Sequence, residues 1–517
     1  MKDFLNSWGL TLGVFLPAVG MVLVLALPKA EEGAQKLVAL LTTVATFGIG
    51  ILLMTNYDYD ASGLQFEQKK SWIDIIHSNY HVGIDGISMP MLILSMFVCI
   101  LAIIYSWNHF PAPHNPKAFL ALILLLEVGM NGTFVAQDLI LFFIFFEIVL
   151  LPMFFMIGVW GGENREYASV KFFLFTLFGS ALMLVSFLAL YFLAGKSGGS
   201  NGLQSFDIKD LTYFAAHNKL GLSSTAQNWI FGGMFLGFAI KVPMFPFHTW
   251  LPDAHTEAPT VGSVLLAAIL LKLGTYGFIR IAIPILPDAA KTWAPWIGFL
   301  AVIGIIYGAL CCLAQRDMKR LIAFSSVAHM GYVMLAISTL TVAGINAAVF
   351  GMVAHGFITG MLFFLAGSIY ERYGTREISR LGGLLQQVPK MGWILGFTCM
   401  ASLGLPGLAG FWGEFPAILS AYKPAPGLPV ETFRTFMVVA AIGTVLAAGY
   451  LLWMFQRVAF GNPKEEFADG HFHDVHGPEW LAWTPMLLLI VVFGVYPNWL
   501  FNITDHTVAP LMKVFGH

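Results

Sequence analysis

The sequence predicts an all-α polytopic membrane protein with about fourteen transmembrane helices. Of its 517 residues, 58% are hydrophobic and only 11% are charged, whereas a soluble domain carries about 25% charged residues. Apolar runs of about 20 residues, long enough to cross a bilayer, recur along the whole chain. Because lipid offers no partner to backbone amides, these runs must form helices, which satisfy their own hydrogen bonds.

The predicted spans are separated by connections that are too short for a soluble domain. The first span follows Lys2 without a clear cleavage site after it, so it is expected to stay as a helix and not to be removed as a signal peptide. The connection 57–85, which includes Trp72 and Ile75, is expected to lie as an amphipathic segment at the membrane interface. The spans are predicted at residues 8–27, 36–56, 86–107, 117–136, 138–160, 168–194, 228–250, 258–283, 293–314, 320–341, 344–370, 392–422, 434–460 and 480–502.

The distribution of Lys and Arg orients these spans. Basic residues are densest at 316–320 and 372–390, in loops that follow odd-numbered spans. Cytoplasmic loops carry the excess of positive charge in membrane proteins. We therefore expect those loops in the cytoplasm and both termini outside it.

Composition and cysteine placement exclude several functional classes. The formal net charge of −2 offers no basic face to a nucleic acid. Cys99, Cys311, Cys312 and Cys399 lie in apolar runs without CxxC spacing, which argues against a disulfide framework and an iron–sulfur cluster. The chain has neither a phosphate-binding loop nor a dinucleotide-binding glycine motif. We expect no metal and no cofactor bound by this chain.

Short strings recur in the two halves of the chain. Ala136-Gln137-Asp138 opens the fifth span, and Ala314-Gln315-Arg316-Asp317 opens the tenth. Lys241-Val-Pro243 in the seventh span corresponds to Glu414-Phe-Pro416 in the twelfth. Each unit then holds five spans, and an odd number requires the two units to be inverted relative to each other, as in many transporters. The sequence thus divides into helices one to three at 1–107, a first repeat at 117–283, a second repeat at 293–460, and a final helix with the tail at 480–517.

Both corresponding spans carry helix breakers beside an ionisable residue. Pro243 and Pro246 follow Lys241, and each removes a helical N–H and clashes with the preceding turn. Two breaks at corresponding positions predict discontinuous helices, which transporters use to build a site near the membrane midplane. The breakers near Glu414 are Gly404, Pro406, Gly407, Gly410, Gly413 and Pro416.

Four ionisable residues lie near the middle of predicted spans: Glu147, Lys241, Lys272 and Glu414. Facing lipid, they would together cost about 10–14 kcal/mol, so they must face one another or water inside the bundle. They could form inert structural ion pairs, or a path for protons in which a moving neighbour changes the charge of a buried group. Their place in the central spans of the repeat favours the proton path.

Four histidines extend this set. His329 and His355 lie in the middle of their spans, where an imidazole can take a proton at one nitrogen and give one from the other. We expect both to act as relays. His248 and His255 are expected nearer the membrane interface, either as gate residues or as structural ones.

Three further features lie outside this set. Lys171 either tunes the charge of Glu147 or extends its ammonium to the surface. Glu127 is a buried acid of undefined role. The tract His471-Phe-His473-Asp-Val-His476 resembles a metal-binding cluster, but it is expected on a solvated loop, and no metal is predicted there.

One long motif and three short ones resemble a known family. The run His248-Thr-Trp-Leu-Pro-Asp-Ala-His-Thr-Glu-Ala-Pro259 is similar to the signature of the antiporter-like subunits of respiratory complex I. Gly83-Ile-Asp-Gly-Ile-Ser88, Phe146-Glu147 and Lys272 within Leu270–Gly274 fit the same family, and the resemblance covers nearly the whole chain. The family also includes subunits of multisubunit sodium/proton antiporters and of related membrane hydrogenases.

The resemblance favours the M-type branch of this family. L- and N-type subunits have lysine at the position of Glu414, and the chain ends soon after its last span, without the long lateral helix of the L-type. The resemblance implies that Glu147, Lys241, Lys272 and Glu414 move protons, with His329 and His355 between them. It also implies L- and N-type neighbours in a bacterial plasma membrane, with NADH, FMN, iron–sulfur clusters and quinone bound by other subunits.

The sequence leaves three alternatives to a proton-pumping subunit of NADH–quinone oxidoreductase. The chain could belong to a stand-alone sodium/proton antiporter, which Glu414 argues against. It could be a scaffold whose ion pairs are inert. It could also belong to a relative of complex I with another electron donor, because nothing in this chain touches the donor.

Overall fold

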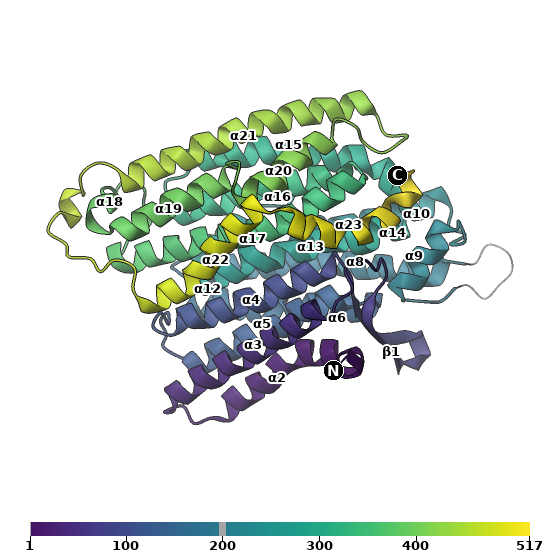
Figure 1. Ribbon diagram of the computed structural model, residues 1–517, viewed down its shortest axis with the longest axis horizontal. Helices are drawn as coiled ribbons and strands as arrows, with labels where there is room; N and C mark the ends of the chain where they lie inside the picture. Colours follow the sequence, from purple (N-terminus) through teal and green to yellow (C-terminus); the bar gives the residue numbers. More distant parts are fainter. Residues whose placement is uncertain (1, 196–202, 517) are drawn as a thin grey trace.

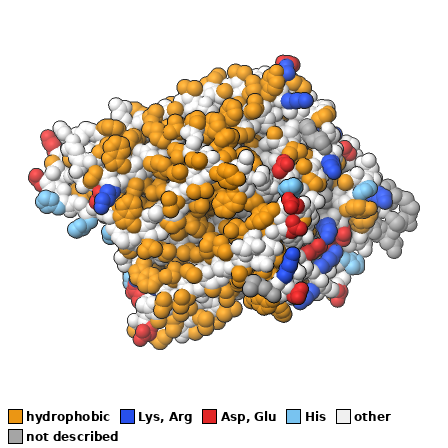
Figure 2. All heavy atoms as spheres, in the orientation of Figure 1, with side chains coloured by type: hydrophobic (Ala, Val, Ile, Leu, Met, Phe, Trp, Pro, Cys, Tyr) orange, Lys and Arg blue, Asp and Glu red, His pale blue; other side chains and the backbone are white. Residues whose placement is uncertain are grey.

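Long helices run side by side along the bundle in the computed structural model, which describes residues 2–195 and 203–516 (Figure 1). Within these residues, twelve helices are long and apolar enough to cross a membrane. Hydrophobic side chains cover the middle of the face in Figure 2, and charged ones gather toward its two ends, as expected for a lipid-facing surface. The twelve are Lys2–Ala26, Glu32–Thr55, Ser88–Ser106, Pro116–Val135, Leu139–Trp160, Arg165–Leu193, Thr260–Ile285, Pro287–Ala314, Met318–Ser338, Val342–Tyr373, Val430–Ala459 and Gly477–Val495.

The other two predicted spans are the two expected to be discontinuous, and the structure confirms both breaks. One is split into α10 (Ser224–Lys241) and α11 (Trp250–Glu257), the other into α19 (Pro389–Ser402) and α20 (Ala409–Ser420). The remaining elements that surround the site are α4 (Ser88–Ser106), α5 (Pro116–Val135), α6 (Leu139–Ile148), α7 (Leu150–Trp160), α8 (Arg165–Leu193), α12 (Thr260–Leu265), η3 (Leu266–Leu270), α13 (Leu271–Gly277), η4 (Phe278–Ala282), α15 (Pro287–Ala314), α16 (Met318–Ser338), α17 (Val342–Tyr373), α21 (Val430–Ala459), α22 (Gly477–Val495) and α23 (Asn498–Met512).

The chain passes through the two helix breaks with different local structures. After α10 the chain turns through Pro243 and Pro246, and the indole N–H of Trp250 donates to the Ile240 carbonyl at 2.9 Å. That bond satisfies one of the carbonyls that a helix leaves free at its C-terminus. Between α19 and α20, Gly404 and Gly407 adopt φ values of +80° and +92°, which only glycine takes up at little cost.

A close crossing of α17 and α20 brings the second break into the bundle. A Cβ added to Gly413 would lie 2.6 Å from the Cα of Gly351, so only two glycines allow the backbones to approach this closely. Glu414, the next residue of α20, is thereby held against α16 and α17.

The connection 57–85, predicted as an amphipathic segment at the membrane interface, forms an antiparallel hairpin of β1 (Gln65–Ile73) and β2 (Ser78–Ile84). Its place at the interface stays a prediction. Phe66 and Gln68 are buried while Glu67 and Lys69 face outward, which is the two-residue period of a strand. The hairpin lies toward the same end of the bundle as both chain termini (Figure 1).

Charged side chains join the hairpin to the segment before α9 (Ile208–Ala216). The buried His81 ring lies between Asp207, 2.6 Å from Nδ1, and Glu67, 2.9 Å from Nε2. Lys69 adds an ion pair with Asp207 at 2.8 Å. Burial alone would raise the pKa of the Asp207 carboxyl. The hydrogen bonds from His81 and Lys69 outweigh this effect and lower the pKa from 3.8 to about 2.

Acid or the substitution Asp207→Asn is expected to loosen this hairpin. A lowered carboxyl pKa contributes stability above about pH 4, roughly 2 kcal/mol at neutral pH, which is lost as the pH falls toward 2. Hydrogen exchange of the β1 amides in the assembled complex should show protection that falls over this range. Asp207→Asn should lower it already at pH 7, whereas Asp210→Asn, at a half-exposed neighbour, should change it little. Equal protection in the Asp207 variant at pH 7 would contradict the assignment.

Candidate functional site

The first charged pair lies where α6 and α10 end. Lys241, the last residue of α10, is 2% exposed, and its ammonium sits 4.8 Å from the centre of the Phe146 ring. Glu147 follows that phenylalanine, and its carboxylate lies near Ser180 and interacts electrostatically with Lys241 without a direct ion pair. Neither the Lys241 amine nor Glu147 Oε1 has a hydrogen-bond partner in the described residues. Lys241 and Glu147 therefore interact electrostatically, and no direct hydrogen bond joins the two side chains.

Lys272 lies near the middle of Thr260–Ile285, one of two fully buried spans among the described residues. The helix around it is widened by two π segments, η3 before it and η4 after it, a deformation that often marks functional sites. The Lys272 amine donates to the Ala267 carbonyl within η3 and lies 2.7 Å from His355 Nδ1. Its side chain is fully buried. Lys272 and His355 thus share a hydrogen bond whose proton either group can hold.

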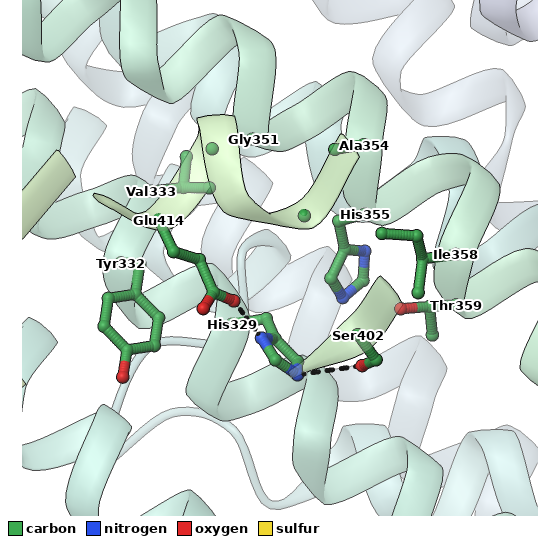
Figure 3. Close-up of a pocket in the computed structure, with 12 residues that line it drawn as sticks. His329, Tyr332, Val333, Gly351, Ala354, His355, Ile358, Thr359, Ser402 and Glu414 are labelled. Carbon is green, nitrogen blue, oxygen red and sulfur yellow. Dashed lines mark hydrogen bonds and ion pairs between the residues drawn. The ribbon is translucent and has the colours of Figure 1, made fainter. Parts of the chain in front are cut away.

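Glu414 and two histidines surround one small cavity (Figure 3). His329 Nδ1 lies 2.5 Å from Glu414 Oε1, and its Nε2 is 3.3 Å from the Ser402 hydroxyl and 3.2 Å from that of Tyr450. The His355 and His329 ring centres are 6.0 Å apart. The cavity has a volume of about 20 Å³, enough for one water molecule.

Unpartnered polar atoms border the gap between the two histidines. His355 Nε2 and Glu414 Oε2 are buried without a hydrogen-bond partner in the described residues. Buried polar atoms are nearly always hydrogen-bonded to protein or water. A water in the cavity would join Lys272, His355, His329 and Glu414 into one hydrogen-bonded row. We call this set the relay row.

The secondary candidates differ in their surroundings. Lys171 forms an ion pair with Asp253 of α11 at 2.6 Å, so the structure gives its ammonium a partner other than Glu147. His248 packs beside the Tyr307 ring at 5.1 Å. His255, expected near the interface, is fully buried, stacks on Phe363, and has no partner for either ring nitrogen in the described residues.

Glu127 is fully buried on α5, and neither carboxylate oxygen has a partner in the described residues. No hydrogen bond links it to the relay row.

Sequence reasoning missed Lys319. It lies in the first turn of α16, is 3% exposed, and donates to the Ala258 carbonyl at the end of α11. Lys319 borders a polar cavity of about 1030 Å³, here called the vestibule. The ammonium groups of Lys319 and Lys272 both interact electrostatically with His255. Its sequence position near a predicted span end suggested only a loop charge. Other charged residues of the vestibule are Glu163, Glu257, Asp317, Arg320, Glu371, Arg376 and Glu377.

The relay row consists of a lysine, two histidines and a glutamate, which are residue types that can take up and release protons. Lysine, histidine and glutamate at hydrogen-bonding distance can exchange a proton when the charge of a neighbour changes. Lys272 and His355 lie in two spans that are fully buried within the described residues, and polar groups are retained there at a high free-energy cost. Fold and site together define a multi-pass membrane protein that holds acids and bases buried among its helices.

Two sequence families match the chain over most of its length. Residues 136–444 match the family described as "NADH:quinone oxidoreductase/Mrp antiporter, TM", and residues 15–133 match "NADH-ubiquinone oxidoreductase chain 4, amino terminus". The chain is 39% identical to NADH-quinone oxidoreductase subunit M of Rickettsia typhi, covering 98% of this chain and 99% of the relative. It is 42% identical to subunit M of Rhodobacter capsulatus, over 94% and 92%.

A solved structure agrees with these sequence relatives. A chain of respiratory complex I from Thermus thermophilus superimposes with a TM-score of 0.85 and 31% identity, covering 98% of this chain and 100% of that one. The chain therefore belongs to the antiporter-like membrane subunits of respiratory complex I. Within that family it is a homologue of NADH-quinone oxidoreductase subunit M, the chain 4 type, and thus a multi-pass subunit of an NADH:quinone oxidoreductase.

Proposed function

We propose that this subunit moves protons along Glu147, Lys241, Lys272 and Glu414, with His355 and His329 as relays, driven by quinone reduction elsewhere in the complex. The observation that carries the proposal is the relay row itself. Lys272 and His355 share one hydrogen bond, His329 and Glu414 share another, and a water-sized cavity separates the two pairs. Inert ion pairs would not need histidines between the charges.

The first step of the proposed cycle is electrostatic. Glu147 stabilises the protonated form of Lys241, which rests on the Phe146 ring without a hydrogen bond to protein in the described residues. A change in the charge or position of Glu147 weakens the hold of Lys241 on its proton. The helix break just after Lys241 gives this residue room to change its partners.

The second step uses the relay row. Lys272 donates its proton to His355 Nδ1, and the ring releases one from Nε2 toward the cavity. From there the proton reaches His329 and Glu414, or leaves. In the first repeat the Glu147 carboxylate faces Lys241, whereas in the second repeat the Glu414 carboxylate faces His329. The two repeats therefore place different residue types at corresponding sites.

The supply of protons to the row is proposed to run through the vestibule. Lys319 at its edge and the unpartnered His255 behind it lie between open polar space and Lys272. The density of charged groups there supports a solvated approach. Lys171, His248 and Glu127 remain secondary candidates.

The proposal includes the surroundings of the chain. We place L- and N-type subunits beside it in a bacterial plasma membrane, with both termini outside the cytoplasm. NADH, FMN, iron–sulfur clusters and quinone are assigned to other subunits. The segments 117–283 and 293–460 are proposed as inverted repeats, which the equivalent breaks at α10/α11 and α19/α20 support.

Glu147→Gln is the test of this proposal. The amide keeps the size of the carboxyl but removes its charge, so NADH-driven proton translocation should fall at least about tenfold. An inert scaffold predicts altered assembly with normal pumping. Assembly is therefore measured in the same membranes by the co-purifying subunits.

The control is Glu166→Gln, at an exposed position of α8, which should leave pumping unchanged. Normal pumping by an assembled Glu147→Gln complex would contradict the proposal. Translocation that requires sodium and continues without a quinone-reducing partner would favour the antiporter alternative.

A further inference from the structure

A second cluster of ionisable groups lies at the end of the bundle away from the hairpin. His109 follows α4, His476 precedes α22, and Glu479 lies in the first turn of α22. One ligand atom from each of these three side chains lies within 4.8 Å of the others. His109 also borders the vestibule. The relay row does not include this cluster.

The His109 ring is fixed in the manner of a metal ligand. Its Nδ1 lies 2.5 Å from Glu371 Oε2, while Nε2 is buried and has no hydrogen-bond partner in the described residues. A carboxylate on one imidazole nitrogen sets the ring orientation and raises the basicity of the other nitrogen. His109 therefore presents an oriented nitrogen with nothing bound to it.

Glu479 supplies a fixed, charged oxygen. The carboxylate is fully buried and is held by Arg372 through two bonds of 2.8 and 2.7 Å. His476 Nδ1 already lies 2.9 Å from Glu479 Oε2, and its side chain is 43% exposed. Two of the three ligand atoms are thus close enough together to reach one cation, and solvent lies on one side.

We propose that His109, His476 and Glu479 bind a zinc-class divalent cation. Two imidazoles, one carboxylate and one open position match a site of tetrahedral zinc. Calcium and magnesium prefer oxygen ligands and are disfavoured by the imidazoles. The tract 471–476 alone predicted no metal, because only His476 of its three histidines takes part and the other ligands come from distant segments.

Zinc at this cluster would tie three helices together at the rim of the vestibule. His109 extends α4, Glu479 belongs to α22, and the supporting Glu371 and Arg372 belong to α17. The same α17 carries His355. Bound zinc is therefore expected to slow proton translocation, an effect that rests on the proposed function, whereas binding itself does not.

The test counts zinc on the intact complex by equilibrium dialysis. His476→Gln should lower the number of zinc ions bound at micromolar concentration by one per complex. His471→Gln, an exposed histidine of the same loop outside the cluster, should bind as many as the unchanged protein. Glu371→Gln should weaken this one site about 10- to 100-fold, since it removes the carboxylate that orients His109.

Unchanged zinc binding in His476→Gln, or loss of the same ion in His471→Gln, would overturn the site. NADH-driven pumping is then measured with and without zinc. Zinc should inhibit the unchanged protein and His471→Gln but not His476→Gln, which should pump normally without zinc. His476→Gln could lose one bound zinc ion while zinc still inhibits the unchanged protein, His471→Gln and His476→Gln equally. That result would support the zinc site but overturn its effect on proton translocation.

Discussion

Lys272→Met is expected to lower NADH-driven proton translocation by the assembled complex at least about tenfold. Methionine fills much of the same space but cannot hold a proton, so the hydrogen bond to His355 Nδ1 is lost. Leaving the buried imidazole nitrogen without a hydrogen-bond partner lowers the stability of the fold by about 1–3 kcal/mol. Translocation is measured as acidification of vesicles after addition of NADH, with quinone reduction recorded in parallel.

Lys272→Arg separates a proton carrier from a structural charge. Arginine keeps the positive charge but does not release its proton in proteins. A relay therefore predicts that pumping is lost in this variant too, whereas a structural cation predicts that it is kept. Lys423→Met, at an exposed loop position, is the control and should pump normally. Full pumping by an assembled Lys272→Arg complex would remove Lys272 from the pathway.

Glu414→Gln is expected to have a comparable effect, again about tenfold or more. The amide can still contact His329, which lies 2.5 Å from the carboxylate, but it cannot accept a proton. Glu414→Asp keeps a titratable group one methylene shorter and should retain part of the activity. The measurement is the initial rate of vesicle acidification for the three forms.

Glu431→Gln, at an 85% exposed side chain on α21, controls for the loss of one surface carboxylate. Assembly is followed through co-purifying subunits, because a misassembled complex also fails to pump. If Glu414→Gln assembled and pumped at the normal rate, the row would have to end at His329.

The broken helices and the buried acids and bases could be predicted from sequence because they depend on local chemistry. Prolines after Lys241 and glycines before Glu414 do not fit a continuous helix. Lysine or glutamate in an apolar run has few outcomes other than burial against a polar partner. These signals do not need knowledge of which helices touch.

The partners of these residues could not be predicted, because they come from tertiary contacts. Lys171 binds Asp253 and not Glu147, since α11 packs against α8. The π segments beside Lys272 leave no mark in the sequence, and Lys319 was taken for a loop charge. The hairpin was missed because its alternating stretch, Phe66 to Lys69, is only four residues long.

In the proposed mechanism, protons cross the membrane through this chain's own buried groups. The most direct measurement is the number of protons translocated per NADH oxidised by vesicles that contain the Lys241→Ala complex, compared with the unchanged complex and with Lys423→Ala. We predict a lower ratio, or loss of turnover and pumping together, for Lys241→Ala alone. A normal proton-to-NADH ratio at normal turnover in an assembled Lys241→Ala complex would contradict the account.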